Sequence, residues 1–518
     1  MTNTYDAICI GSGMGGLVAG ALAAQEGKRV LVLEKHSAFG GAVNTYRRKG
    51  MRLEVGLHGT DGLDPADPKY RLFNKLDLYN RVDFVKATDE LYTVRHPILE
   101  KPFTMPVDPA RAIEATKDRF PRHADGIEEF FKIVNEIRSK VSLISQRQGD
   151  VLFWLVNAPI AVFRFWILGK MEKTTVSALL DRLFGDDEAI KFALCANLGY
   201  YGDDPDNFSL MYFSVGQGSF LAGGCHYIRG GSHHLTDTLV EMITSAGGEV
   251  LPRRCVEEII VERGKAVGVV HVDASSGEDP REARAGAVFG NAAPEHLSTM
   301  LPEDRREKFM KKHTGRPLSP SLWTVHFVLD RPLGDFGSPG YSTFVYPAWH
   351  ERFSQMAQNW EVMSTPPGDR TPMYVVVDYS AIDSGIGDED KYMVTLCGFD
   401  RPSNWESLDR AEYKARKAAW LDRISSDLYR QFPGMEEHVL FKEMATALTM
   451  KKFINNPGGA VYGYAQDMIS SGRFRPNAVT SVPGLFLSSS YALPGGGVTG
   501  AMLSGQNAFR FARRKGFI

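Results

Sequence analysis

The chain has 518 residues, of which 43% are hydrophobic, 24% charged and 11% aromatic, and this composition excludes a disordered, collagen-like or coiled-coil protein. Its 60 lysines and arginines nearly balance 62 aspartates and glutamates, so the formal net charge is −2 and the basic excess of a general nucleic-acid binder is missing. At about 100–200 residues per domain, we expect two or three structural units. The five cysteines include no Cys-x-x-Cys pair, which indicates reduced thiols in a cytoplasmic protein, without a disulfide framework or a zinc site.

The first residues predict a complete βαβ unit. An apolar run at 5–10 is typical of a buried strand, a helix-compatible stretch covers 17–25, and a second apolar run at 29–33 ends at Glu34. Between the first strand and the helix lies the spacing Gly11-x-Gly13-x-x-Gly16. In this pattern the first glycine makes a tight turn, the second admits a pyrophosphate and the third lets the helix pack on the strand. A carboxylate at Glu34 is placed to accept from a ribose hydroxyl, so this context favours a dinucleotide site over a plain glycine-rich turn.

The rest of the chain predicts a fold built from discontinuous segments. Apolar residues recur at helical spacing through residues 71–225, without sustained strand alternation. Further elements are expected in chain order as follows: a helix at 235–246, a hairpin at 255–261 and 266–272, strands at 323–329, 373–378 and 393–399, and a C-terminal helix at 500–514. We predict an α/β fold with a Rossmann-like domain of the glutathione-reductase type and a discontinuous α+β substrate domain. The predicted boundaries are 1–70, 226–300 and 450–518 for the nucleotide-binding domain, and 71–225 (mainly helical) and 301–449 for the substrate domain.

A second glycine pair separates two classes of dinucleotide. Gly40-Gly41, a few residues after the ribose acid, is typical of FAD enzymes and not of NAD dehydrogenases. At this point the chain resembles the FAD-dependent phytoene desaturase, carotenoid isomerase and retinol saturase family, over essentially its whole length. The resemblance rests on four blocks in the correct order and a weaker fifth: 11–41 with its extension 52–58; 227–231; 255–259 paired with 290–294; 484–487 followed by 494–500; and 456–463.

The resemblance implies a set of FAD-binding residues. Val256 is expected to hold the adenine side through its backbone, and 494–497 with the following helix start to face the isoalloxazine ring and the ribityl chain. This chain departs from the family at Ser489-Ser490, where Gly-Asp or Gly-Ala is frequent, and at Glu54, a longer acid than the usual aspartate at a position expected to face the cofactor. The full predicted set is Gly11, Gly13, Gly15, Gly16, Glu34, Lys35, Gly40, Gly41, Ala42, Val256, Asn291, Ala292, Ser489, Ser490, Gly496, Gly497, Val498 and Thr499.

The same resemblance implies hydride chemistry through the flavin, so no conspicuous acid–base set is required. His58 is the best side-chain candidate for catalysis, because the stretch 56–58 is expected to run beside the flavin; a purely structural, hydrogen-bonded histidine is the alternative. His226, His233 and His234 flank the turn at Gly230 and are interpreted as loop or surface residues, so no metal is expected. With no second dinucleotide fingerprint, electrons are expected to exchange with oxygen, a quinone, a partner or transiently bound nicotinamide.

Residues 151–169 are unusually apolar and aromatic. The run reaches the length of about 18 residues that a membrane span requires, but Asn157, Pro159 and Arg164 argue against a clean span. Two interpretations stay open, a buried helix pair in the core and a patch that dips into lipid and admits a hydrophobic substrate. We therefore expect a cytoplasmic protein, with a peripheral position on the inner face of a membrane as the open alternative.

We predict an FAD-dependent oxidoreductase that desaturates or saturates C=C or C–C bonds of a long apolar polyene, isoprenoid or related lipid. Three alternatives stay open. The first is a flavin-dependent cis–trans isomerase of a polyene without net redox change. The second is an enzyme related to amine or protoporphyrinogen oxidases, although Cys397 is the last cysteine and excludes a flavin tether near the C-terminus. The third is a non-catalytic FAD-bearing binding protein. No nucleic-acid partner is expected.

Overall fold

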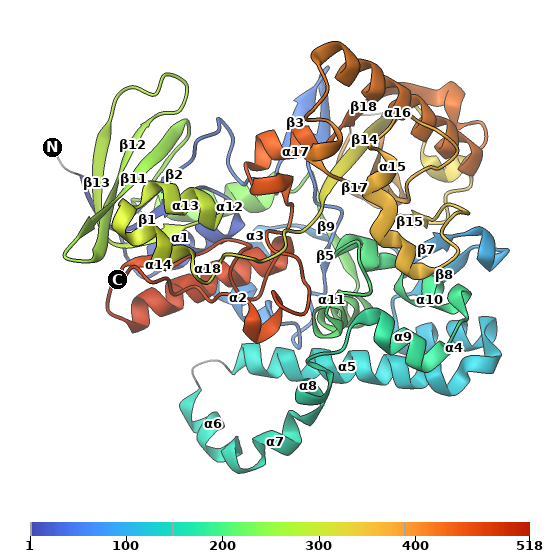
Figure 1. Ribbon diagram of the computed structural model, residues 1–518, viewed down its shortest axis with the longest axis horizontal. Helices are drawn as coiled ribbons and strands as arrows, with labels where there is room; N and C mark the ends of the chain where they lie inside the picture. The colour runs from blue at the N-terminus through green and yellow to red at the C-terminus, as the bar shows by residue number, and fades with distance from the viewer. Residues whose placement is uncertain (1–2, 148–149, 388–389) are drawn as a thin grey trace.

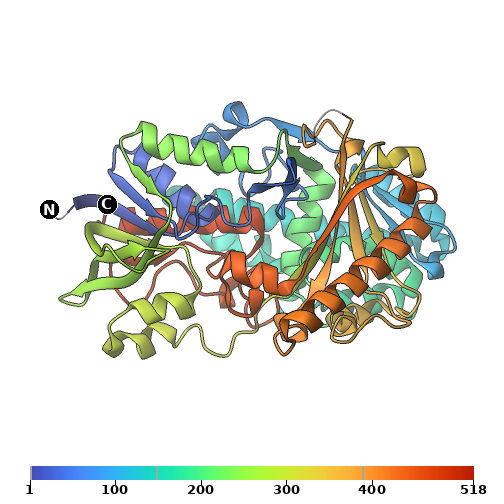
Figure 2. The same cartoon turned by 90° about the horizontal axis from the view of Figure 1, so that it is seen from above.

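The computed structural model describes residues 3–147, 150–387 and 390–518. Two β-sheets lie at opposite ends of the long axis of the molecule, with helices beside each of them (Figures 1 and 2). Both chain termini lie at the end that carries the first sheet. The region between the two sheets is where segments from distant parts of the sequence meet.

The first sheet has a parallel part and a hairpin. Its parallel strands pair in the order β10 (Glu249–Leu251), β2 (Val30–Leu33), β1 (Asn3–Ile10), β13 (Arg281–Gly290) and β19 (Leu485–Leu487). The hairpin of β11 (Arg254–Glu262) and β12 (Lys265–Asp273) joins β13 in antiparallel register. All four residues of β2 are buried, because helices cover both faces of a parallel sheet and its strands are then apolar on both sides.

Three helices from distant parts of the chain pack on or beside this sheet: α1 (Met14–Gln25), α12 (His233–Ser245) and α18 (Gly497–Arg514). Nearly every residue of α1 is buried, as expected for a helix that is apolar on all sides. Helices α1 and α18 approach closely, since a Cβ at Gly505 would lie 2.2 Å from the Gly15 carbonyl oxygen. The first βαβ unit, the hairpin and the C-terminal helix are therefore confirmed, although α18 begins three residues earlier than predicted.

The second sheet is mostly antiparallel. Its order is β18 (Val439–Ala445), β14 (Ser321–Leu329), β17 (Tyr392–Asp400), β16 (Tyr374–Asp378), β15 (Ser342–Val345), β7 (Glu90–Arg95) and β8 (Phe103–Pro106). Strand β7 pairs parallel to β15, and the other neighbours pair antiparallel. Helix α16 (Arg410–Gln431) crosses the sheet and buries Trp420. The predicted strands β14, β16 and β17 are confirmed.

The segment 71–225 is mainly helical, as predicted, but it also supplies short strands to a small sheet and to the second sheet. Strands β7 and β8 are short and lie at the edge of the second sheet, where alternation over four to six residues is easily missed. A further three-stranded sheet joins β5 (Thr60–Asp61), β9 (Cys225–Ile228) and β6 (Phe84–Lys86). The helices of this segment are α2 (Tyr70–Lys75), α3 (Leu78–Arg81), α4 (Pro109–Arg119), α5 (Ala124–Gln146), α9 (Val176–Phe184), α10 (Glu188–Cys195) and α11 (Leu210–Gly223). The exact domain boundaries stay a prediction.

Residues 151–171 form three short helices that project from the body next to the end of α5 (Figure 1). They are α6 (Val151–Asn157), α7 (Ala161–Arg164) and α8 (Trp166–Met171), and together we call them the excursion. Within the described residues, no helix is both long enough and apolar enough to cross a membrane. The buried-core interpretation of this segment is wrong, since its large apolar side chains with more than half of their surface exposed are Val151, Leu152, Leu155, Val156, Ile160, Val162, Phe163 and Trp166.

Candidate active site

A cavity of about 940 Å³ lies between the two sheets and receives residues from both. This volume is at the upper end of the range of about 300–1,000 Å³ for ligand pockets. The cavity begins beside the turn after β1 and the end of β2, passes the start of α18, and reaches helices α5, α8 and α11. The residues predicted from the sequence that line it are Gly11, Gly13, Glu34, Lys35, Gly40, Gly41, Ala42, His58, Val256, Asn291, Ala292, Ser489, Ser490, Gly496, Gly497, Val498 and Thr499.

Two of the predicted residues, Gly15 and Gly16, do not line the cavity. A Cβ at Gly15 would lie 1.6 Å from the Ser488 carbonyl oxygen, and one at Gly16 would lie 2.3 Å from the Gly11 carbonyl oxygen. Contacts below 3.0 Å are not tolerated, so both glycines serve the packing of α1 against its neighbours. For Gly16 this is the role expected of the third glycine in the fingerprint.

The acid at the end of β2 is held by the turn that precedes α1. The Glu34 carboxylate accepts from the Ser12 amide at 2.9 Å, from the Ser12 hydroxyl at 2.6 Å and from the His36 amide at 2.9 Å. A carboxylate has about four acceptor positions, so this network leaves one for a ligand. Because Glu34 also lines the cavity, its geometry fits a hydroxyl donor such as the ribose of a dinucleotide.

Asn291 links three of the sequence blocks. With its amide oxygen toward the Gly13 amide and its amide nitrogen toward the Ser488 carbonyl, it accepts at 2.9 Å and donates at 3.2 Å. The Ser489 hydroxyl donates to the Ala292 carbonyl at 3.0 Å, so this departure from the family pattern supports the same junction. The contacts hold β1, β13 and the segment after β19 together at the base of the cavity.

The start of α18 forms another wall of the cavity. A Cβ at Gly496 would lie 2.3 Å from Cβ of Tyr462, so only glycine lets these segments approach. The Tyr212 hydroxyl of α11 donates to the Gly496 carbonyl at 2.8 Å. Amide groups of the first helical turn lack partners inside the helix, and they suit an acceptor such as a flavin carbonyl.

Glu54 does not face the cavity, which corrects the prediction from the sequence. Its side chain is only 1% exposed and accepts from the Tyr227 hydroxyl at 2.6 Å, the Ser232 amide at 3.0 Å and the Ser232 hydroxyl at 2.6 Å. Burial raises the pKa of Glu54, and the hydrogen bonds from Ser232 and Tyr227 oppose that shift. The residue therefore joins the first sequence block to the second and does not touch the ligand space.

His58 lies deep in the cavity wall. Its Nδ1 is 3.9 Å from the Cys397 sulfur, and its ring meets the Tyr200 ring edge to face at 5.7 Å between centroids. Burial, together with the nearby His326, lowers the pKa of His58 to about 4. The imidazole is therefore neutral at neutral pH and is suited to orienting a ligand rather than to acting as an imidazolium acid.

The cavity also contains residues that sequence reasoning missed. Asp61, Tyr200, Thr324 and Cys397 line it, although they come from four separate segments. The hydroxyl oxygen of Thr324 is buried and has no hydrogen-bond partner among the described residues. No spacing signal in the sequence relates these positions, because they lie on β5, after α10, on β14 and on β17, and these segments meet only in the folded chain.

The far end of the cavity is apolar. Its walls there are Val141 and Ile144 of α5, Leu168 of α8, and Met211 and Val215 of α11. The end of α5 and helix α8 are also where the excursion joins the body (Figure 1). The apolar end of the cavity is therefore lined by the helices that lead to the exposed apolar side chains of the excursion. This arrangement suits a long apolar ligand that reaches the cavity from that side.

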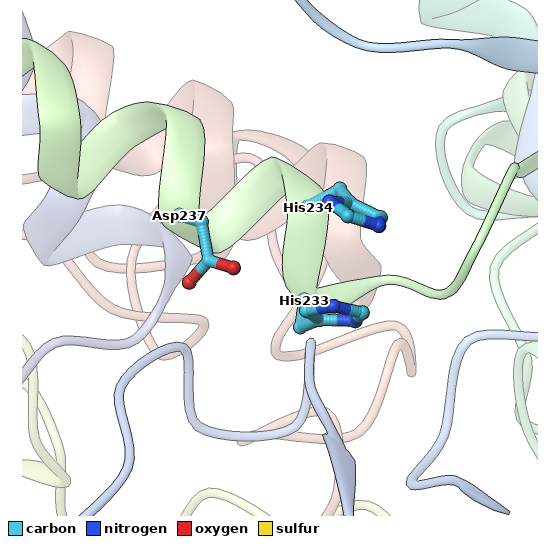
Figure 3. Close-up of side chains that lie close together, drawn as sticks. All are labelled: His233, His234 and Asp237. Atoms are coloured by element: carbon cyan, nitrogen blue, oxygen red, sulfur yellow. The ribbon is translucent and has the colours of Figure 1, made fainter. Parts of the chain in front are cut away.

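Three residues of α12 come close enough to suggest a metal site. Figure 3 shows His233 and His234 on the first turn of the helix and Asp237 one turn further along, and one ligand atom of each lies within 4.8 Å of the others. However, Nε2 of His233 is 2.7 Å from the Arg52 guanidinium and its Nδ1 is 3.0 Å from the Thr45 hydroxyl. Both ring nitrogens are thus engaged and a fixed positive charge is adjacent, which disfavours a cation.

The three histidines near Gly230 were interpreted as loop or surface residues; the surface interpretation holds for His234, which is exposed, whereas His226 and His233 are partly buried. His226 is a strand residue of β9, and His233 and His234 are the first residues of α12, so none of them lies in a loop. His226 pairs with Thr60 across the small sheet, and burial lowers its pKa to about 4. The expectation that no metal binds stays a prediction.

Comparison with known proteins places the chain in a family. Residues 14–509 match the model of the flavin-containing amine oxidoreductases, so the chain belongs to that family. The class is that of FAD-dependent oxidoreductases, with a Rossmann-like FAD domain and a substrate domain. The cavity fits this cofactor, since the glycine-rich turn, the Glu34 carboxylate and the start of α18 succeed one another along its wall.

Curated relatives are more specific than the family. The chain is 23% identical to all-trans-retinol 13,14-reductase of Danio rerio, over 88% of this chain and 77% of that protein. It is 26% identical to prolycopene isomerase 2 of an Oncidium hybrid cultivar, over 99% of this chain and 84% of that protein. These two relatives match the family that the sequence blocks indicated.

Solved structures share the fold. An oxidoreductase from Methanosarcina mazei has a TM-score of 0.63 at 17% identity, covering 98% of this chain and 100% of that chain. Putrescine oxidase bound to putrescine has a TM-score of 0.61 at 14% identity, covering 99% of both chains. At these identities the likeness concerns the fold and says nothing about the substrate.

Proposed function

We propose that the protein oxidises or reduces a C=C or C–C bond of a long apolar polyene or isoprenoid. The observation that carries the proposal is the single cavity that joins the dinucleotide motifs to an apolar end lined by Val141, Ile144, Leu168, Met211 and Val215. Relatives named for retinol and prolycopene support the same substrate class. The amine oxidase alternative has less support, because it rests on the description of the whole family and on structural likeness at 13–14% identity.

We place the two ends of FAD by the contacts already described. The adenosine end would lie beside Glu34, Lys35 and Val256, and the isoalloxazine end beside Gly496 and the first turn of α18. Bound FAD supplies hydride transfer, and the chain positions the substrate and keeps water away. His58 would then orient the substrate from the wall opposite, as a neutral imidazole between Cys397 and Tyr200.

Half-reactions of the holoenzyme test the redox function. Photoreduced enzyme is mixed without oxygen with all-trans-retinol, and flavin absorbance reports reoxidation while chromatography reports the product. Reoxidation with one equivalent of a saturated product supports a reductase. Flavin that stays reduced with every polyene, in an enzyme that loads FAD, would refute C=C reduction.

An isomerase is the second candidate, since the prolycopene isomerase relative is 26% identical over 99% of this chain. The same experiment separates it from a reductase. An isomerase holding reduced flavin converts prolycopene to another isomer over many turnovers while the flavin absorbance is unchanged. A desaturase instead reduces oxidised flavin with its substrate, which gives the opposite absorbance change.

We also propose that the protein binds a membrane surface through the excursion. The support is the exposure of Phe163 and Trp166, at 82% and 63%, in a segment that projects away from both sheets (Figure 1). An exposed apolar patch of this kind is covered by a partner or by lipid. Lipid is favoured here because the apolar end of the cavity begins at Leu168 and Ile144, so a hydrophobic substrate would pass from the bilayer to the cavity without crossing water.

A further inference from the structure

A lysine is buried between two carboxylates behind the cavity. The side chains of Lys69 and Asp67 have no exposed surface, and Lys69 Nζ lies 2.9 Å from Asp67 Oδ1 and 3.1 Å from Asp61 Oδ1. Lys69 Nζ also donates to the Asp61 carbonyl. Asp67 Oδ2 is buried and has no hydrogen-bond partner among the described residues. Two carboxylates share one ammonium, so the group carries a net negative charge unless it binds a proton.

The titratable groups around the cluster do not compete with its two carboxylates for a proton near pH 7. The titratable groups that face the cluster from neighbouring elements are Asp64, Tyr79, Tyr201, Tyr212, Cys225 and His226. Burial raises the pKa of Tyr212 and of Cys225 to about 12 and lowers the pKa of His226 to about 4, so these groups are neutral near pH 7. Asp64 is paired with the Arg138 guanidinium at 2.6 Å. Desolvation raises the pKa of Asp67 to about 6, which is close enough to neutrality for proton exchange.

Asp61 connects the cluster to the cavity. It ends the short strand β5, where pairing with Cys225 of β9 fixes its backbone, and its side chain lines the cavity. The Thr499 hydroxyl, in the first turn of α18, donates to Asp61 Oδ1 at 2.8 Å. Lys69 and Asp67 do not line the cavity, so Asp61 is the member of the cluster that a ligand can reach.

We propose that Asp61 exchanges a proton with the substrate. Lys69 and Asp67 are positioning residues: Lys69 stabilises the negative charge of Asp61, and the two carboxylates together hold one exchangeable proton, which we call the proton store. The inference rests on the proposed C=C chemistry. In a saturation the π bond breaks, one carbon takes a hydride from the reduced flavin, and the neighbouring carbon takes a proton. Asp61 delivers the proton that the two carboxylates hold, so an O–H bond breaks as that second C–H bond forms, and the carboxylates that remain are stabilised by Lys69 Nζ. A proton from water then restores the store, and a desaturation runs the same transfer in reverse.

Infrared difference spectroscopy of the holoenzyme tests this proton directly. Photoreduction of bound FAD would add negative charge to the cavity that Asp61 lines, so the parent is expected to gain a carboxylic-acid C=O band that shifts in D2O. Asp61→Asn is expected to lose this band. Asp83→Asn is the control, because Asp83 pairs with Arg229 at the exposed surface and is expected to keep it. If Asp61→Asn fails to load FAD, Asp61→Ser is measured in its place, since it removes the carboxyl group with less bulk.

The proposal and the proposed function fail in different ways. In the half-reaction with all-trans-retinol, Asp61→Asn is expected to slow flavin reoxidation by about 10²–10⁴-fold, the range for a positioned proton donor, while Asp83→Asn matches the parent. A parent enzyme that no polyene reoxidises would contradict the C=C function, whatever the infrared result. A band that persists in Asp61→Asn, or a parent without such a band, would overturn the proton store and leave the C=C function standing.

Discussion

The excursion offers the most decisive test of membrane binding. Replacing Phe163 and Trp166 with serine removes two large apolar side chains that are 82% and 63% exposed. Fully burying a large apolar side chain contributes about 1.5–3 kcal/mol, so lipid that covers the exposed fractions of this pair would contribute about 2–4 kcal/mol. Because 1.4 kcal/mol is a factor of about ten, the double variant is expected to bind liposomes roughly 30- to 1,000-fold more weakly. Its melting temperature is expected to stay unchanged, since exposed side chains contribute little to folding.

The assay is co-sedimentation with liposomes, run beside a thermal melt. Leu440→Ser is the matched control, because Leu440 is 55% exposed on β18, far from the excursion (Figure 1). Trp154 is unsuited to this test, since its indole N–H donates to the Arg147 carbonyl at 2.9 Å and its loss would loosen the excursion itself. A parent protein that does not sediment with liposomes, or a double variant that binds as well as the parent, would refute the lipid interpretation.

Two further predictions concern the cavity, and a third concerns the buried His326 of β14. Gly13→Val is expected to abolish FAD loading, measured by flavin absorbance, because a Cβ there would lie 2.5 Å from the side-chain amide of Asn291. His58→Ala is expected to lower turnover about 10²-fold or more while flavin content holds, with no step in the pH profile near 6.5. Burial lowers the pKa of His326 to about 4, below its unfolded value of about 6.5. The unfolded chain therefore takes up a proton at this residue before the folded chain does, so about 3 kcal/mol of the free energy of unfolding is present above pH 6.5 and is lost as the pH falls toward 4. Between pH 6.5 and pH 4 the urea midpoint of His326→Gln is expected to fall less than that of the parent protein.

Each of these has its own control or contrary result. Gly334→Val is the control for loading, because nothing lies within 4 Å of a Cβ there, and full loading of Gly13→Val would place the phosphates elsewhere. A His58→Ala variant that loses FAD together with activity would indicate a structural role only. For His326, equal loss of stability in parent and variant between pH 6.5 and 4 would show that burial does not hold its imidazole neutral.

Much of the first sheet could be predicted because its signals are local. The β2 run is apolar over every residue, and the Gly11-to-Gly16 spacing lies within a single turn, so neither depends on distant contacts. The same holds for the hairpin of β11 and β12, whose strands are neighbours in sequence. Strands β7 and β8 were missed because both are short, and because β7 is tied to the second sheet only through β15, a partner far away in the chain that it meets after folding.

The candidate site also contains residues that the sequence could identify and residues whose position only the fold decides. Gly15 belongs to the glycine pattern, yet its surroundings, the Ser488 carbonyl and α18, are decided by the fold. Glu54 lies in a block expected beside the cofactor, but its carboxylate points to Ser232 because that turn offers it two donors. Asp61 carries no motif at all, and only the pairing of β5 with β9 and the approach of α18 bring it to the cavity.

The sequence by itself determined the dinucleotide fold and the flavin class, because glycine spacing and continuous apolar runs act through the local backbone and its burial. The apolar substrate class was implied by the resemblance to a known family. Only the tertiary structure decided that residues 151–171 face outward, since an apolar run is compatible with a core or with a surface until its neighbours are placed. It also decided which ionisable groups meet. A buried Lys69 between Asp61 and Asp67 depends on three side chains that the chain brings together from a loop, a short strand and a helix start.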